Sequence, residues 1–123
     1  MSTWDTEIAR ALTAPDEVRL STVRRDGSHR TPPIIWDVAV GDRVFIRSTN
    51  GRGADWFRWA IATGRGRLEA GHAAYEVVFV EAEEIDLPQV DAAYRRTYRR
   101  YAAIVDHLLT DGPRAATLEV LPA

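Results

Sequence analysis

The sequence predicts an α+β domain in which helices flank a small antiparallel β-barrel of six strands. Apolar and polar residues alternate along several short segments, which is typical of strands with one buried face. The tight-turn pairs Asp26-Gly27 and Gly41-Asp42 join consecutive segments, as in β-hairpins. A long, tyrosine-rich segment with helical spacing precedes the last of these strands. Since no linker or internal repeat interrupts the 123 residues, we expect a single domain, residues 1–123.

In the first half of the chain, the pattern predicts a helix followed by three strands. Trp4 and Leu12 lie on one stripe of the helix, and Pro15 ends it. Pro32 and Pro33 restrict the beginning of the second strand to a sheet edge or a barrel mouth, because proline cannot donate to a β-ladder. These elements are expected at Thr3 to Ala14, Val18 to Arg25, Arg30 to Val40, and Val44 to Arg47.

In the second half, the pattern predicts a short helix, two strands, a long helix and a final strand. Gly64 is well placed to end the short helix in the left-handed conformation. Tyr94, Tyr98 and Tyr101 repeat at helical spacing along the long helix, which Gly112-Pro113 is expected to end. The elements are expected at Asp55 to Thr63, from Leu68 onwards, through Tyr75 and Phe79, at Gln89 to Leu109, and at Ala116 to Leu121.

The composition excludes several kinds of chemistry. Cysteine is absent, which rules out disulfides, thiolate metal sites and thiol nucleophiles. Lysine is also absent, because all 16 basic residues are arginine, so neither a Schiff base nor a P-loop lysine is available. The three histidines fit no metal-binding spacing, and His72 is the least implausible proton donor among them. We therefore predict no metal site and assign no catalytic side chain.

The charge and hydropathy pattern excludes two classes of partner. A net charge of −2 gives no general attraction to nucleic acid. No apolar run approaches the roughly 20 residues that a membrane span needs. The N-terminus lacks the basic region of a secretory signal. We expect a cytoplasmic protein that binds neither nucleic acid nor membranes.

A polar, glycine-rich turn between a strand and a helix is the first candidate binding site. Free N–H groups and the helix dipole attract anions to a helix start, and arginine adds a planar fork that matches phosphate. The segment either holds a phosphorylated cofactor or is an ordinary surface loop with a capped helix. Its polar residues are Arg47, Ser48, Thr49, Asn50, Gly51 and Arg52, and Trp56 follows on the helix.

Two aromatic segments are further candidates. Trp36 follows Thr31-Pro32-Pro33 and either forms a flat wall for a planar ring or belongs to the core. Asp37 is expected to face solvent or a neighbouring subunit. The tyrosines of the long helix lie beside a strip of arginines, which is either a solvated face paired with acids or an electropositive rim for an anionic tail. These arginines are Arg95, Arg96, Arg99 and Arg100.

The order of these segments resembles the FMN-binding split-barrel superfamily, over about Val18 to Leu121. More narrowly, it resembles an actinobacterial branch near the deazaflavin-dependent nitroreductases. No single motif is diagnostic, and it is the order of the motifs that makes the resemblance specific. They are Arg30 to Trp36, Val44 to Ser48, Ala54 to Arg58, Gly66 to Gly71, the tyrosine-rich helix, and the ending Leu118 to Pro122.

The resemblance implies a homodimer with a deazaflavin or FMN in a groove near the barrel mouth. The ring would lie near Thr31, Pro32, Pro33 and Trp36. The phosphate-bearing arm would be held by Arg47, Ser48, Asn50, Gly51, Arg52 and Trp56, and the substrate by Tyr94, Tyr98 and Tyr101.

In such proteins the cofactor performs the hydride chemistry. The function expected from the resemblance is therefore an oxidoreductase that transfers hydride to a small hydrophobic acceptor. Two alternatives stay open: a cofactor-free isomerase or cyclase of small-molecule biosynthesis that uses the same groove, and a non-catalytic ligand-binding module.

Overall fold

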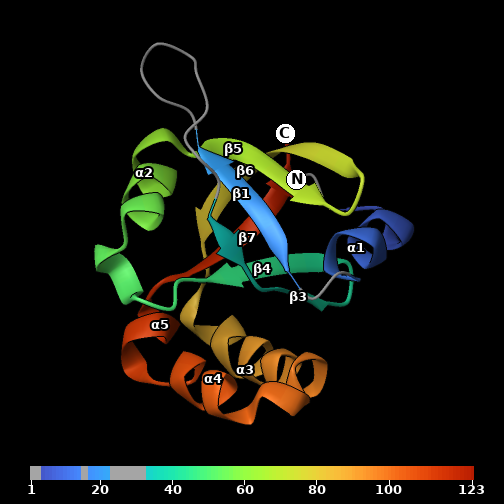
Figure 1. Ribbon diagram of the computed structural model, residues 1–123. Helices are drawn as coiled ribbons and strands as arrows, with labels where there is room; N and C mark the ends of the chain where they lie inside the picture. Colours follow the sequence, from blue (N-terminus) through green and yellow to red (C-terminus); the bar gives the residue numbers. More distant parts are fainter. Residues whose placement is uncertain (1–3, 15–16, 23–32) are drawn as a thin grey trace.

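A computed structural model of the chain describes residues 4–14, 17–22 and 33–123, and the structural statements below concern these ranges. In them, seven strands and five α-helices alternate with short 3-10 turns (Figure 1). The strands are β1 (Val18–Thr22), β2 (Ile34–Ile35), β3 (Asp37–Val40), β4 (Arg43–Arg47), β5 (Arg65–Ala70), β6 (Ala73–Glu81) and β7 (Thr117–Pro122). The α-helices are α1 (Thr6–Thr13), α2 (Asp55–Thr63), α3 (Leu87–Thr97), α4 (Ala102–Leu108) and α5 (Asp111–Ala115). The 3-10 turns are η1 (Gly51–Gly53), η2 (Glu84–Asp86) and η3 (Arg99–Tyr101).

The strands form one antiparallel sheet that curls into a nearly closed barrel. Its order is β2-β1-β5-β6-β7-β4-β3, so the two edge strands are β2 and β3. Only Trp36 separates these two strands in the chain, although β2 pairs with β1 whereas β3 pairs with β4. The chain therefore crosses the opening of the barrel at Trp36, and we call this crossing the seam.

The seam accounts for the difference between the predicted and the observed strands. The predicted α+β barrel is confirmed, but the described part of the chain has seven strands and not six. The single strand expected over Arg30 to Val40 is divided at Trp36, because its two halves pair with different neighbours. The Asp26-Gly27 turn lies outside the described residues, whereas Gly41 makes its expected turn with a φ of 64°.

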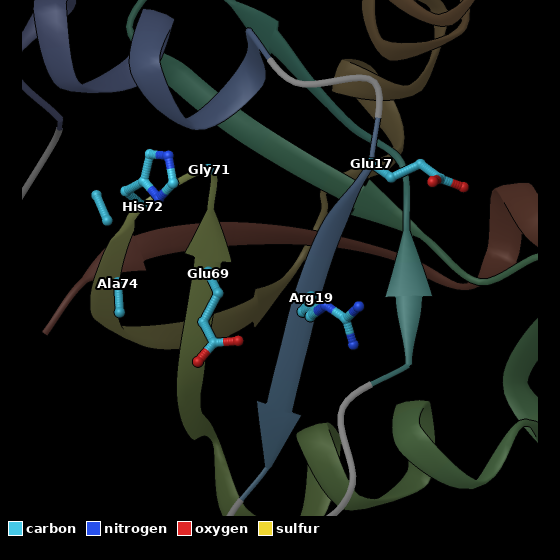
Figure 2. Close-up of a pocket in the computed structure, with 7 residues that line it drawn as sticks. Glu17, Arg19, Glu69, Gly71, His72 and Ala74 are labelled. Atoms are coloured by element: carbon cyan, nitrogen blue, oxygen red, sulfur yellow. The ribbon is translucent and has the colours of Figure 1, made fainter.

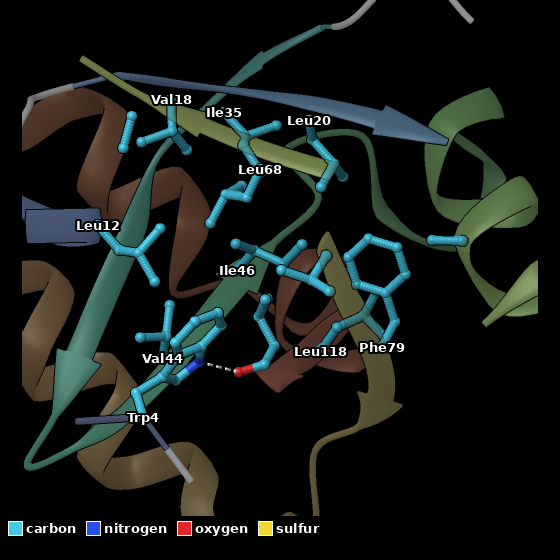
Figure 3. Packing of buried hydrophobic residues seen from close by; sticks show 14 of the residues in the cluster. Trp4, Leu12, Val18, Leu20, Ile35, Val44, Ile46, Leu68, Phe79 and Leu118 are labelled. Atoms are coloured by element: carbon cyan, nitrogen blue, oxygen red, sulfur yellow. Dashed lines mark hydrogen bonds between the residues drawn. The ribbon is translucent and has the colours of Figure 1, made fainter. Parts of the chain in front are cut away.

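Apolar side chains form two clusters, one on each side of the β3–β4 hairpin. The first fills the barrel and includes the indole of Trp4, whose Nε1 donates a 2.8 Å hydrogen bond to the carbonyl of Val120 (Figure 3). The second joins the outer face of the hairpin to α3 and α4, which lie together below the sheet in Figure 1. It contains Val38, Phe45, Val90, Ala93, Tyr94, Tyr98, Val105 and Leu108.

The long helix predicted before the last strand is interrupted. It is divided into α3, η3, α4 and α5, and Tyr98 leaves the helical conformation with a φ of −117°. Gly112 and Pro113 lie inside α5 and do not end a helix. A proline is tolerated there because the first turn of a helix has no partner for its N–H groups.

Candidate functional site

A groove of about 360 Å³ lies at the seam and joins three parts of the fold. The seam supplies an apolar wall, α4 supplies a second apolar wall, and the groove is bordered between them by Arg47, at the end of β4, and by Thr49, just after it. The exposed carboxylate of Glu17, just before β1, completes the lining. The other lining residues are Ile34, Ile35, Trp36, Arg47, Thr49, Ile104 and Leu108.

Trp36 is fixed by the tyrosines of the helical layer. Its ring stacks on that of Tyr98, with centroids 4.4 Å apart and an interplanar angle of 11°, and tilts against Tyr101 at 5.2 Å. The hydroxyl of Tyr94 donates a 2.7 Å hydrogen bond to the main-chain carbonyl of Trp36. Trp36 is thus both partly buried core and groove wall, so the two interpretations of this residue are compatible.

Arg47 is a buried cation whose donors are only partly used. Nε donates to Thr117 Oγ1 at 2.7 Å, and Nη1 donates to Asp91 Oδ1 at 2.7 Å and to the carbonyl of Leu108 at 3.0 Å. Nη2 is also buried, and it has no hydrogen-bond partner among residues 4–14, 17–22 and 33–123. Arg114 Nε donates to the other oxygen of Asp91 at 3.0 Å, so two guanidinium groups share one carboxylate.

The three tyrosines predicted to contact substrate occupy different environments. Tyr94 and Tyr98 are buried, and their hydroxyls are used by main-chain carbonyls of the seam. Burial raises the pKa of Tyr94 far above its usual value, so its hydroxyl stays protonated. Tyr101 is 38% exposed and lies beside Trp36. Of the three, Tyr101 is the one with an exposed ring, although it is not among the residues that line the groove.

Asp37 does not face solvent as expected. It is fully buried, and its cross-strand partner is Ile46, a residue of the barrel core. Residues directly opposite in an antiparallel pair project from the same face, so Asp37 faces the barrel interior. Neither carboxylate oxygen has a hydrogen-bond partner in the part of the chain that the structure describes. Burial raises the pKa of Asp37 to about 8, so the carboxyl group is largely protonated at neutral pH.

The alternation of β3 contains a signal for this buried acid that sequence reasoning missed. Trp36 and Val38 both belong to the helix-facing cluster, so Asp37 between them faces the other way. In a flat sheet with one solvated face, that direction is solvent. In a barrel, it is the core.

Part of the segment predicted to hold a phosphate arm packs against another part of the protein. The hydroxyl of Ser48 is buried without a partner in the described ranges, and Asn50 is exposed. Gly51 has a φ of +72°, and a Cβ placed on it would lie 3.5 Å from the carbonyl oxygen of Gly112. This turn therefore packs against the start of α5.

Arg52 and Trp56 are also engaged elsewhere. Arg52 Nη1 donates to Glu81 Oε1 at 2.6 Å and to the carbonyl of Ala115 at 2.8 Å. The guanidinium also lies 5.1 Å from the ring centroid of Phe57. Trp56 packs partly buried against the barrel core. Of the residues predicted for the phosphate arm, only Arg47 lines the groove, together with its neighbour Thr49.

The predicted ring-contacting residues before the seam are only partly described. Thr31 and Pro32 lie outside the described residues. Pro33 is partly buried, and its carbonyl accepts a 3.1 Å hydrogen bond from the amide of Leu20, which ties it to β1.

A second hollow, of about 310 Å³, lies on the outer surface of β1, β5 and the turn before β6 (Figure 2). Its side chains are mostly exposed, and Arg19 stands directly opposite Glu69 in the β1–β5 pair. His72 also lies here, on a different surface from the Trp36–Arg47 groove, whereas Glu17 borders both hollows. Within the described ranges, no three His, Asp or Glu side chains group as a metal site. None of the helices described is long and apolar enough to cross a bilayer.

Solved structures share this fold at low sequence identity. The heme storage protein HutZ from Vibrio cholerae is 15% identical, with a TM-score of 0.68 over 98% of this chain and 91% of that one. An F420-H2-dependent reductase, FDR-A, is 15% identical, with a TM-score of 0.64 over 86% and 93%. A FAD-binding protein from Mesorhizobium loti is 15% identical, with a TM-score of 0.63 over 100% and 92%. These similarities show the split-barrel fold of flavin- and heme-binding proteins, and at such identities they show the fold alone.

The sequence was also compared with curated proteins and with family models. No curated protein matches the chain. A family model described as "Uncharacterized protein conserved in bacteria (DUF2255)" matches residues 8–120, which is nearly the whole sequence. The chain therefore belongs to the bacterial family DUF2255.

Proposed function

We propose that this protein is an oxidoreductase that binds the ring of a deazaflavin or FMN in the seam groove and transfers hydride to a small hydrophobic acceptor. One observation carries the proposal. Trp36 and Arg47 come from separate segments of the sequence and meet in one mostly apolar groove, where the Arg47 side chain has a buried, unpartnered nitrogen.

The groove fits a planar, conjugated ring with carbonyl oxygens. Its volume lies within the roughly 300–1,000 Å³ usual for small-molecule sites, and such sites combine apolar walls with a few polar groups. A buried donor left without a partner costs about 1–3 kcal/mol. Nη2 of Arg47 is such a donor within the described residues, but it has no exposed surface, so the wall that a ring would contact is the apolar one of Trp36, Ile34 and Ile35.

In this proposal the protein's residues hold the cofactor ring and the acceptor next to each other. A bound flavin or deazaflavin would supply the hydride-carrying ring. Arg47 would keep the end of β4 in place beside the ring, because Thr117, Asp91 and the carbonyl of Leu108 hold its buried guanidinium. Ile104 and Tyr101 are partly exposed on the helical side and would contact the hydrophobic acceptor.

Similar folds support the proposal without choosing the ligand. An F420-H2-dependent reductase and a FAD-binding protein have this fold, and so does a heme storage protein. Among the described residues, the side chains that line the groove include no histidine, methionine or tyrosine, and the sequence has no cysteine; these four are the usual axial ligands of heme iron. The lining therefore favours a flavin-type ring over heme.

We also propose that the protein acts as a homodimer. Ile34, Tyr101 and Ile104 are exposed at or near the groove, and a partner subunit would cover the parts of these side chains that a bound ligand leaves exposed. Light scattering during size-exclusion chromatography checks this proposal, and a monomer at micromolar concentration would contradict it.

The proposed function is tested first by binding. The purified protein is titrated with FMN and with an 8-hydroxy-5-deazaflavin nucleotide, and cofactor fluorescence is recorded. We expect saturation below about 100 µM, within the ~1 µM to ~1 mM range of enzyme substrates. Trp36→Leu removes the aromatic wall and should weaken binding at least about tenfold. Arg67→Gln, in an exposed pair on the sheet surface, is the matched control and should bind as the wild type does.

Turnover is tested second. The reduced cofactor is mixed anaerobically with menadione, a small hydrophobic hydride acceptor, and its oxidation is followed by absorbance. Faster oxidation in the presence of the wild type than of Trp36→Leu supports an oxidoreductase. Binding without faster oxidation of this or other hydrophobic acceptors would instead favour a ligand-binding module. No binding of either cofactor at 100 µM would contradict the proposal and leave the cofactor-free alternative.

A further inference from the structure

The outward side of α3 is an exposed surface with an uncharged middle. Pro88, Gln89 and Ala92 are exposed along it, and Ile85, in the preceding η2 turn, is 79% exposed. The buried residues of α3 lie on the opposite side of the helix, in the second apolar cluster. The described part of the chain therefore leaves this side of α3 uncovered.

One end of this surface carries positive charge. Arg95, Arg96 and Arg99 are exposed, and none of the three makes an ion pair within residues 4–14, 17–22 and 33–123. Two acids near the start of α3, Glu81 and Asp86, pair with arginines of other elements. These three arginines of the predicted strip are therefore not neutralised by the acids that the structure describes.

The other end of the surface carries negative charge. Glu83 and Glu84, at the beginning of η2, are exposed, and they too make no ion pair in the described ranges. Glu84 and Arg95 are separated by about three helical turns, so they lie on the same side of the helix. The surface thus has a negative end and a positive end, roughly 17 Å apart.

Such a surface is complementary to itself when two copies meet with their α3 helices antiparallel. In a two-fold contact, residue i of one copy meets residue j of the other, and j meets i. With the axis near Gln89, Glu84 of each copy would lie beside the partner's Arg95. Ile85 would pack on the aliphatic stem of the partner's Arg96. Opposite charges would then meet at both ends, whereas parallel helices would place like charges together.

We propose that α3 of one copy pairs with α3 of a second copy in this antiparallel arrangement. None of the residues named for the contact lines the Trp36–Arg47 groove, so the inference goes beyond the proposed function and needs no cofactor. The contact also differs from the partner surface proposed around Ile34, Tyr101 and Ile104. A contact of about three helical turns is smaller than the ~1,200–2,000 Å² of standard interfaces, so the association is reversible and is weakened by salt.

Charge reversal tests the contact in the cofactor-free protein, whose mass is measured by sedimentation equilibrium at up to about 500 µM. We expect the wild type to associate in 50 mM NaCl, and at least about tenfold more weakly in 500 mM NaCl. Glu84→Arg and Arg95→Glu should each weaken the association at least about tenfold, because each places like charges at both ends of the contact. An equimolar mixture of the two variants should associate as the wild type does, because both ends of a mixed pair again join opposite charges.

A single engineered cysteine tests where the axis lies, because the chain has no cysteine of its own. Gln89→Cys should form a disulfide-linked dimer under mild oxidation. Ala62→Cys, at an exposed position of α2, is the control and should form at least about tenfold less. Equal crosslinking of the two variants would overturn the antiparallel arrangement.

The inference fails separately from the proposed function. A wild type that does not associate in 50 mM NaCl would overturn the inference and leave this surface to a different partner. Association that neither salt nor charge reversal changes would also overturn it, because the contact would then lie elsewhere, for example around the groove. A mixture of the two charge variants that stays dissociated would overturn the pairing of Glu84 with the partner's Arg95. Each of these outcomes leaves cofactor binding in the groove untouched.

Discussion

The hydroxyl of Tyr98 donates a 2.6 Å hydrogen bond to the main-chain carbonyl of Asp37, 61 residues earlier in the chain. Tyr94 makes a parallel bond to the neighbouring carbonyl of Trp36 at 2.7 Å. Both carbonyls lie at the seam, where the barrel is not closed by pairing between β2 and β3. The two tyrosines therefore connect α3 and the turn after it to the opening between the edge strands of the described sheet.

Removal of the Tyr98 hydroxyl should destabilise this junction. Tyr98→Phe keeps the ring stacked on Trp36 but leaves a buried carbonyl without its donor, at a cost of about 1–2 kcal/mol. Urea unfolding followed by tryptophan fluorescence measures the change. Tyr101→Phe, at a partly exposed tyrosine of the same layer, is the control and should be nearly neutral. If the two substitutions lowered the free energy of unfolding equally, the hydrogen bond from Tyr98 to Asp37 would not be a specific source of stability.

The buried carboxyl of Asp37 should make stability fall as the pH rises. Its pKa increases from 3.8 to about 8 on folding, because burial disfavours the charged form. Between these values the folded state keeps a proton that the unfolded state has released, so the free energy of unfolding decreases by up to about 1.4 kcal/mol per pH unit. The contribution is fully present below about pH 4 and is lost by about pH 8.

Asp37→Asn removes this titration while preserving the shape of the side chain. The variant should gain stability relative to the wild type as the pH rises from 5 to 8, and thermal unfolding across that range measures the difference. Asp55→Asn, at the start of α2, is the control. A difference between Asp37→Asn and the wild type that stays constant with pH would mean that Asp37 is ionised in the folded protein.

The parts of the fold set by neighbouring residues were predictable from the sequence. Alternation and tight turns identify the strands, and Gly64 ends α2 in the left-handed conformation as expected, with a φ of 69°. The break at Trp36 was not predictable in this way. It depends on β1 and β4 each pairing with half of one apparent strand, and only the closed three-dimensional sheet determines that.

Two residues of the candidate groove were among the predicted site residues, but the arrangement of the groove was not predicted. Trp36 and Arg47 were both expected to contact a ligand, and the structure brings them into one groove. Arg47 is nevertheless used mainly inside the protein, because Asp91 and the carbonyl of Leu108 lie 44 and 61 residues further along the chain. The residues next to Arg47 in the sequence do not reveal such distant partners, so the sequence alone does not distinguish a paired arginine from an unpaired one.

The pairing of Arg47 with Asp91 should matter far more than the exposed pair of Arg52 with Glu81. Asp91→Asn leaves a buried guanidinium without its counter-charge, and loss of one partner of a buried pair costs about 3 kcal/mol or more. Glu81→Gln breaks a pair whose side chains are 49% and 51% exposed, which should change stability by less than about 1 kcal/mol. Urea unfolding compares the two variants.

A double variant tests whether the stability lost in Asp91→Asn comes from the uncompensated charge of Arg47. Arg47→Met in the Asp91→Asn background removes the uncompensated cation, so part of the lost stability should return. If the double variant is no more stable than Asp91→Asn alone, the guanidinium is stabilised by its other partners, and the ion pair is not the main interaction there.

Gly66 should be intolerant of even one added methyl group. It lies in β5 between β1 and β6, where a Cβ would clash with the main-chain carbonyl oxygen of Ser21 and meet the ring of Phe79 at 2.9–3.0 Å. Because a strand on each side holds β5 in place, the clash can be relieved only by moving the barrel wall. Gly66→Ala should therefore cost about 2–3 kcal/mol, as overpacked cores do.

Gly53→Ala is the matched control for this substitution. A Cβ at Gly53 meets nothing within 4 Å, and Gly53 is not among the glycines with positive φ. Alanine there restricts mainly the unfolded chain, so the variant should be neutral or up to about 1 kcal/mol more stable. Thermal unfolding of both variants distinguishes local crowding from a general effect of replacing glycine. If Gly66→Ala unfolds at the wild-type temperature, β1 and β5 are not packed as closely as the structure has them.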